Sequence, residues 1–200
     1  MSRQDIRKKV WECASQLIEE KGYASPVDLL VKMGRLKPKR VKPVKLQDII
    51  DEMEMQMDEC HKYLNTETGE IITVSSEELG IAEESEEDDD FSEYPDWQRD
   101  SVDQALDVVM NWGNGKYIEL PDKWDIHEYS IIEAFCGSVS NDRISNALYS
   151  AIQGRGAFRR FKDAIRRYDI EDSWYKFRDE AFKKLAVEWC EENNIPNVET

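Results

Sequence analysis

Residues 60–74 read CHKYLNTETGEIITV, and this stretch decides the fold class. Two short β-prone runs flank the segment NTETG, whose Gly69 suits the left-handed position of a hairpin loop. A further strand-like run, KYIEL at 116–120, is closed by Pro121. We therefore expect a small antiparallel sheet of about three strands.

Helical patterns surround these strands. Residues 47–57 form a predicted helix whose buried stripe is Ile49, Ile50, Met53 and Met57. Further helices are predicted at 98–112, 126–138, 141–152, 157–168 and 173–193. Asp125 and Glu128 have the spacing of a capping box before the second of these. The predicted fold class is α+β, with helices covering the sheet and a helical C-terminal half.

The first 43 residues differ from the rest. Ile6, Val10, Cys13 and Leu17 repeat at helical spacing and predict a helix at 3–20. A second short helix is predicted to run from Ser25-Pro26 to Met33, and the pair fits either a helix-turn-helix or a plain helical hairpin. The proline-containing basic segment RLKPKRVKPVK, 35–45, follows. We expect a basic helical arm and linker at 1–43 and a main α+β domain at 44–200.

Charge is unevenly distributed along the 200 residues, whose net charge is −16. Residues 1–45 carry a net +7, residues 46–100 a net −18 and residues 101–200 a net −5. Seven acids and one serine form a run at 83–90, which is typical of a solvated acidic loop. Overall negative charge disfavours non-specific attraction to nucleic acid or anionic lipid.

Composition also bears on location. No apolar run approaches the ~20 residues of a membrane span, so we expect no membrane partner. The four cysteines include no CxxC pair, which favours buried, reduced thiols and a cytoplasmic protein.

No catalytic motif is present. His61 and His127 are the only histidines, so a triad or a metal site must use one of them or do without. Cys60 and His61 are adjacent and point to opposite faces of a strand, which argues against joint metal ligation. Asp125, His127 and Glu128 can be drawn as an acid/base cluster, but capping accounts for the two acids. We predict no catalytic residue, no metal and no cofactor.

The basic stretch QGRGAFRRFKDAIRRY, 153–168, stands out in an acidic chain. At 100° per residue, Phe158, Phe161, Ile165 and Tyr168 share one face, and both Phe158 and Phe161 are predicted core anchors. The preceding Gly-Arg-Gly allows a tight turn at a helix N-terminus, a geometry that suits a phosphate. The predicted anion- or partner-binding residues are Arg155, Arg159, Arg160, Lys162, Arg166 and Arg167.

Several interpretations of this helix stay open. It can be neutralised internally by acidic helices or by the 83–90 run. If the helix is instead a free surface, we expect a non-enzymatic binding or regulatory protein that holds nucleic acid or an acidic protein segment. One alternative is an enzyme acting on a phosphorylated or nucleotide-like substrate, with Arg155 and Arg159 as phosphate clamps. Another is an acidic mimic of nucleic acid that blocks a basic protein.

Five phrases carry a family resemblance: DIIDEMEMQMDECHKYLNTETGEI, FSEYPDWQ, YIELPDKWDIHEYSIIEAF, AIQGRGAFRRFKDAIRR and WYKFRDEAFKKLAVEWCEENNI. In order and spacing the chain resembles the uncharacterised bacterial protein family 0158 (UPF0158) over roughly residues 44–195. The resemblance implies a cytosolic bacterial protein and assigns no function. The matching residues include Gly154, Arg155, Gly156, Phe158, Arg159, Arg160, Phe161, Trp174, Phe177, Arg178 and Trp189. The arm at 1–43 goes beyond the family pattern.

Overall fold

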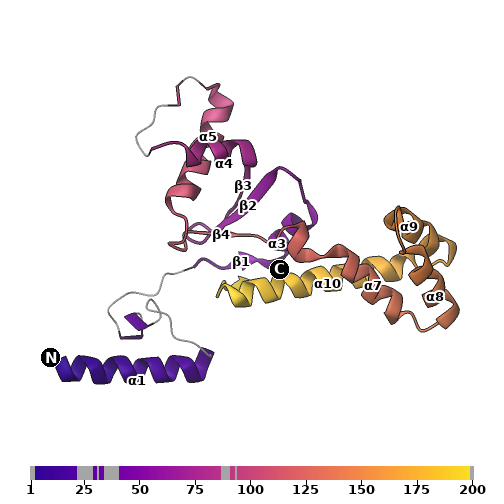
Figure 1. Ribbon diagram of the computed structural model, residues 1–200, viewed down its shortest axis with the longest axis horizontal. Coiled ribbons are helices and arrows are strands. Elements are labelled where there is room, and N and C mark those ends of the chain that lie inside the picture. The colour runs from indigo at the N-terminus through magenta and orange to yellow at the C-terminus, as the bar shows by residue number, and fades with distance from the viewer. Residues whose placement is uncertain are drawn as a thin grey trace. The chain divides into compact units, whose positions relative to one another are not determined.

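The computed structural model describes residues 3–21, 29–30, 32–33, 41–86, 91–92 and 94–198. The chain divides into two compact units, Met1–Arg40 and Val41–Thr200 (Figure 1). That the arm is separable from the body, with a boundary at 43/44, stays a prediction. No helix among the described residues is long and apolar enough to cross a membrane.

The first unit contains α1, which spans Arg3–Lys21 and confirms the helix predicted there. Only Cys13 and Leu17 of its predicted stripe are buried, whereas Ile6 and Val10 are exposed. Lys9 Nζ donates a hydrogen bond to the carbonyl oxygen of Met33 at 3.3 Å. Most of the predicted second short helix lies outside the described residues.

The sheet of the second unit has the strand order β3-β2-β4, and both pairings are antiparallel. β2 (Cys60–Asn65) and β3 (Ile71–Ser75) form the predicted hairpin, and β4 (Tyr117–Glu119) pairs with the other edge of β2. Gly69 has a φ of +76°, the left-handed conformation expected of the loop glycine. The α+β fold class is confirmed.

Alternation along β2 sends neighbouring side chains into two cores. Tyr63 packs in a cluster with α4 (Ser76–Glu83) and α5 (Asp96–Met110). Leu64 joins a larger cluster with α3 (Leu46–Glu54) and the C-terminal helices. In Figure 1, α4 and α5 lie together near the sheet, while the C-terminal helices gather along α10. The sheet therefore separates two apolar layers.

Five helices make up the C-terminal half: α6 (Lys123–Ile126), α7 (Glu128–Ser138), α8 (Asp142–Ala151), α9 (Ala157–Arg167) and α10 (Glu171–Glu192). The predicted capping box of Asp125 with Glu128 is wrong. Asp122 caps α6 and pairs with Asp125, because the chain makes a short extra helix before it turns left-handed at His127. Glu128 instead accepts a hydrogen bond from Arg178 at 3.3 Å.

Met57 also differs from expectation. α3 ends at Glu54, so Met57 lies beyond the helix and is 50% exposed rather than buried. Cys13, Cys136 and Cys190 are buried, Cys60 is half-buried, and all four thiols are free. Burial raises the pKa of Cys136 to about 11, which leaves this thiol protonated at neutral pH.

The two ends of the second unit meet in a pairing that the sequence analysis did not anticipate. β1 (Val44–Lys45) runs parallel to β5 (Asn197–Val198), and Val44 is opposite Asn197. The Val44 N–H donates to the carbonyl oxygen of Pro196 at 3.0 Å. Just upstream, the Lys42 N–H donates to the carbonyl oxygen of Thr66 at 3.0 Å, which ties the start of the unit to the hairpin loop.

Candidate anion-binding site on a basic helix

One apolar face anchors α9. Phe161 is 1% exposed, and its ring centroid lies 4.9 Å from that of Trp174 on α10 and 6.1 Å from that of Phe135 on α7. Phe158 is 44% exposed, so the prediction that it is a core anchor is wrong. The aromatic cluster is centred one turn further along the helix, and Phe158 lies instead beneath Lys162, whose Nζ is 5.9 Å from the ring centroid.

The Gly-Arg-Gly segment makes the tight turn that its sequence predicts. Gly154 and Gly156 have φ values of +70° and +79°, and Gly156 is the N-cap residue of α9. A Cβ added to Gly156 would come within 3.3 Å of Arg160 Nη1. Arg155 is exposed between the two glycines. The turn thus brings a cation to the start of the helix.

Arg160 differs from the other basic residues of α9. Its Nε donates to the carbonyl oxygen of Ala151 at 3.0 Å, and its Nη1 donates to the carbonyl oxygen of Arg155 at 2.5 Å. Its Nη2 donates to the carbonyl oxygen of Gln153. One guanidinium therefore satisfies backbone acceptors at the end of α8 and in the turn, where helices leave carbonyl groups unpaired. These bonds occupy the donors with which Arg160 was predicted to bind an anion.

The remaining predicted site residues are exposed. Arg166 Nε lies 3.3 Å from Glu171 Oε1, in an ion pair with the first turn of α10. The side chains of Arg155, Arg159 and Arg167 have neither a hydrogen bond nor an ion pair with any residue that the structure describes. Asp163 is the single carboxylate within the α9 sequence. The helix therefore presents a basic face, which we define as Arg155, Arg159, Lys162, Arg166 and Arg167.

The contacts of α9 show how far its positive charge is neutralised within the described part of the protein. Within the described part of the chain, internal neutralisation of the basic face is limited to the ion pair of Arg166 with Glu171. Arg160, Asp163 and Arg167 are among the residues that line a groove between α8 and α9. His127 lies at the junction of α6 and α7 and does not line this groove. Residues 87–90 of the predicted acidic loop lie outside the described residues.

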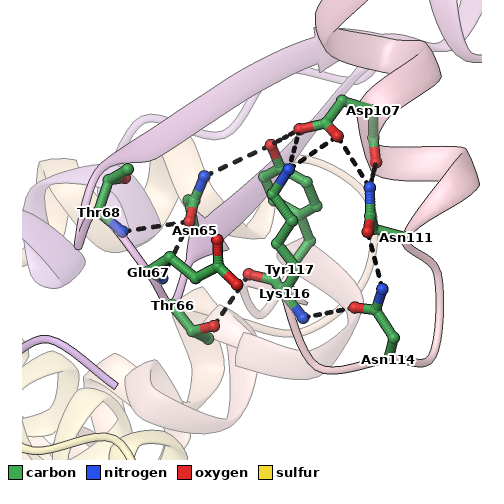
Figure 2. A network of polar contacts seen from close by, with 9 residues as sticks. All are labelled: Asn65, Thr66, Glu67, Thr68, Asp107, Asn111, Asn114, Lys116 and Tyr117. Carbon is green, nitrogen blue, oxygen red and sulfur yellow. Dashed lines mark hydrogen bonds and ion pairs between the residues drawn. The ribbon is translucent and has the colours of Figure 1, made fainter. Parts of the chain in front are cut away.

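A polar network links the hairpin loop, β4 and α5 (Figure 2). Asp107 on α5 accepts hydrogen bonds from Lys116 Nζ at 2.6 Å, from Tyr117 Oη at 2.5 Å and from Asn111 Nδ2 at 2.8 Å. Partial burial raises the pKa of Asp107, but the bonds from Lys116 and Tyr117 outweigh it and hold that pKa below its usual value. Because these partners saturate the carboxylate, we interpret the network as structural.

Sequence reasoning missed one constellation entirely. His61 Nδ1 lies 3.2 Å from Glu119 Oε1, and His61 Nε2 lies 3.2 Å from Ser76 Oγ. The three residues come from β2, β4 and the start of α4. The sequence contains only two histidines, which made His61 a candidate site residue. Nothing in the sequence indicated that Glu119 and Ser76 would be its partners.

Comparisons with known proteins give one match. The model of the Uncharacterised protein family (UPF0158) matches residues 41–200. No curated protein and no solved structure matches the chain.

Proposed function

We propose, for a chain that belongs to the Uncharacterised protein family (UPF0158), that it is a binding protein whose basic face on α9 holds an anionic partner. The observation that carries the proposal is the exposure of Arg155, Arg159 and Arg167 without an acidic partner in the described residues. A chain with 43 acidic residues has ample means of neutralising its own cations. Leaving these three unpaired keeps them available for an external anion.

One feature favours single-stranded nucleic acid over an acidic protein segment. Arginine presents a planar fork of donors that matches phosphate and carboxylate oxygens alike, so the cations do not distinguish the two partners. Phe158 lies exposed beside Lys162 and offers an aromatic surface on which a base can stack. An acidic peptide uses the cations but gains little from the ring.

The net charge of −16 limits where such a partner can bind. A polyanion is repelled by most of an acidic surface and attracted only where cations gather. We therefore expect one short contact, centred on the basic face. At 1.5 Å per residue, an 11-residue helix is about 16 Å long, which accommodates only a few nucleotides.

The test is a titration of the full chain with a fluorescent 20-nucleotide RNA and, separately, with a poly-glutamate peptide, each at 50 and 200 mM salt. For about three neutralised phosphates of a single strand, RNA affinity should fall roughly 20-fold across this range. The double variant Arg159→Gln/Arg167→Gln should weaken binding and flatten the salt dependence. Lys176→Gln/Lys184→Gln, on exposed positions of α10, removes the same charge and should bind normally.

Phe158→Ala separates the two partners. It should weaken RNA binding about fivefold or more, because stacking on an aromatic ring contributes roughly 1–3 kcal/mol per base. Binding of poly-glutamate should be unchanged. If the wild type binds neither polyanion at 50 mM salt, or if the α10 variant loses as much affinity as the α9 variant, the proposal is wrong.

A further inference from the structure

The contacts of His61 have the order of a nucleophilic triad. Glu119 Oε1 is 3.2 Å from Nδ1, and Ser76 Oγ is 3.2 Å from Nε2. A carboxylate beside Nδ1 favours the tautomer with a proton on that nitrogen, which leaves Nε2 free to accept the proton of the serine hydroxyl. In serine hydrolases the same roles are divided among acid, base and nucleophile. We call Glu119, His61 and Ser76 the His61 relay.

The sheet positions the relay. His61 and Tyr63 are two residues apart on β2 and so share a face, and Glu119 on β4 pairs directly with Tyr63. The His61 ring stacks on the Tyr63 ring, with 6.5 Å between centroids and 19° between planes. A packed ring on the central strand thus fixes the orientation of the imidazole.

Ser76 lies where β3 passes directly into α4. The neighbouring Ser75 forms a capping box with Glu78, and the Ser76 N–H donates to the carbonyl oxygen of Glu59 at 2.8 Å. These hydrogen bonds fix the backbone at the junction of β3 and α4, while Ser76 is exposed to solvent. A serine at a strand-to-helix turn is the placement that exposes the nucleophile in α/β-hydrolases.

A pocket of about 630 Å³ opens beside the relay, and all three relay residues line it. Its apolar wall consists of Leu79, Val108, Val109 and Trp112, together with Tyr63. The volume and the mixture of apolar walls with a few convergent polar groups are those of small-molecule sites. The relay therefore faces a space that can hold a substrate.

The residue after Ser76 has a backbone N–H without an acceptor among the described residues. The Glu77 N–H belongs to the first turn of α4, where backbone amides lack intrahelical acceptors, and no described residue accepts from it. The amide that follows the nucleophile contributes to the oxyanion hole of α/β-hydrolases. A backbone donor near the positive end of a helix stabilises developing negative charge.

Charge restricts the substrate. Glu83 and Glu119 both line the pocket. Their effect is visible at Tyr63, where burial first, and then the negative charges of Glu119 and Glu83, raise the pKa to about 12. A negative pocket with apolar walls favours a neutral or cationic acyl group and disfavours a carboxylate-bearing one.

We propose that the His61 relay hydrolyses carboxylic esters with small apolar, uncharged acyl groups. Ser76 Oγ attacks the carbonyl carbon and its proton passes to His61 Nε2; the carbon–oxygen bond to the alcohol breaks, and His61 returns the proton to the departing alkoxide. Water then attacks the Ser76 ester and gives a proton to His61. The serine oxygen leaves with that proton, and the carboxylic acid is released. Glu119 is a positioning residue that stabilises the imidazolium.

The full chain should hydrolyse p-nitrophenyl butyrate and, as the more direct test, react with diisopropyl fluorophosphate to give an adduct that peptide mass mapping assigns to Ser76. Hydrolysis of mono-p-nitrophenyl succinate should be at least tenfold slower than that of the butyrate. Ser76→Ala and His61→Gln should each lower the rate at least 100-fold, while Ser173→Ala, at an exposed serine of α10, should not. Adduct mapping uses the wild type and so does not depend on the variants folding.

Glu119→Gln should lower kcat with little change in KM, and Glu119→Asp should recover part of the loss. If Glu119 had only a structural role, the substitutions would not change kcat selectively over KM. Absence of any adduct at Ser76, or hydrolysis that persists in Ser76→Ala, would overturn the inference. The basic face shares no residue with the relay, so the outcome of this test is independent of polyanion binding.

Discussion

Phe161 and Phe158 lie three residues apart on α9 and have opposite environments. Phe161 is 1% exposed within the aromatic cluster, whereas Phe158 is 44% exposed. Phe161→Ala should therefore lower the free energy of unfolding by about 3–5 kcal/mol, because it opens a cavity in the core. Phe158→Ala should cost less than about 1 kcal/mol. Urea unfolding of both variants provides the comparison, and equal losses would contradict the assignment of the two environments.

The contrast shows what residue patterns do and do not predict. Helical periodicity correctly places Phe158, Phe161 and Ile165 on one side of α9, but it cannot say how far along that side the neighbouring helices reach. The partners of His61 were harder still to predict from the sequence. Its partners Glu119 and Ser76 are set by strand register and by the turn after β3, both of which depend on contacts distant in sequence.

At the scale of elements, Arg160 joins α8 to α9. Arg160→Ala should lower the free energy of unfolding by about 1–3 kcal/mol, since it leaves the carbonyl groups of Ala151, Gln153 and Arg155 without a charged donor. Arg159→Ala, one residue away with no such bonds, is the matched control and should change stability by less than about 0.5 kcal/mol.

Arg160→Lys should not restore the stability of this joint, because a single ammonium cannot reproduce the planar fork that reaches four carbonyl groups. Thermal and urea unfolding of the three variants measure the effect. A fully stable Arg160→Ala variant would show that water replaces the guanidinium without cost, and Arg160 would then rejoin the candidates for anion binding.

The elements themselves were predicted where their signals are local. The hairpin, β4 and the C-terminal helices follow from β-prone runs, a loop glycine and helical periodicity within short windows. The pairing of β1 with β5 could not be predicted, because two-residue strands carry no pattern and lie about 150 residues apart. The capping box was misplaced by three residues because both Asp122 and Asp125 suit an N-cap.

At the scale of the whole molecule, the arm and the body should be separable. A truncated chain beginning at Val41 keeps Lys42, whose N–H bonds to Thr66, and all of the second unit, so its melting temperature should stay within about 3 °C of the full chain. A chain beginning at Leu46 loses β1 and buried Val44, and should melt at least about 4 °C lower. Equal losses in the two truncated chains would show that the arm stabilises the body.

The parallel pairing of β1 with β5 also has a topological consequence. Neighbouring strands lie about 4.8 Å apart, so the second unit forms an almost closed circuit that enters and leaves at one point. A short peptide could bridge that point, and the circuit could be reopened between Gly113 and Asn114, which are both exposed. The fold then does not depend on the order in which the elements are synthesised, and circularly permuted chains should reach the same fold.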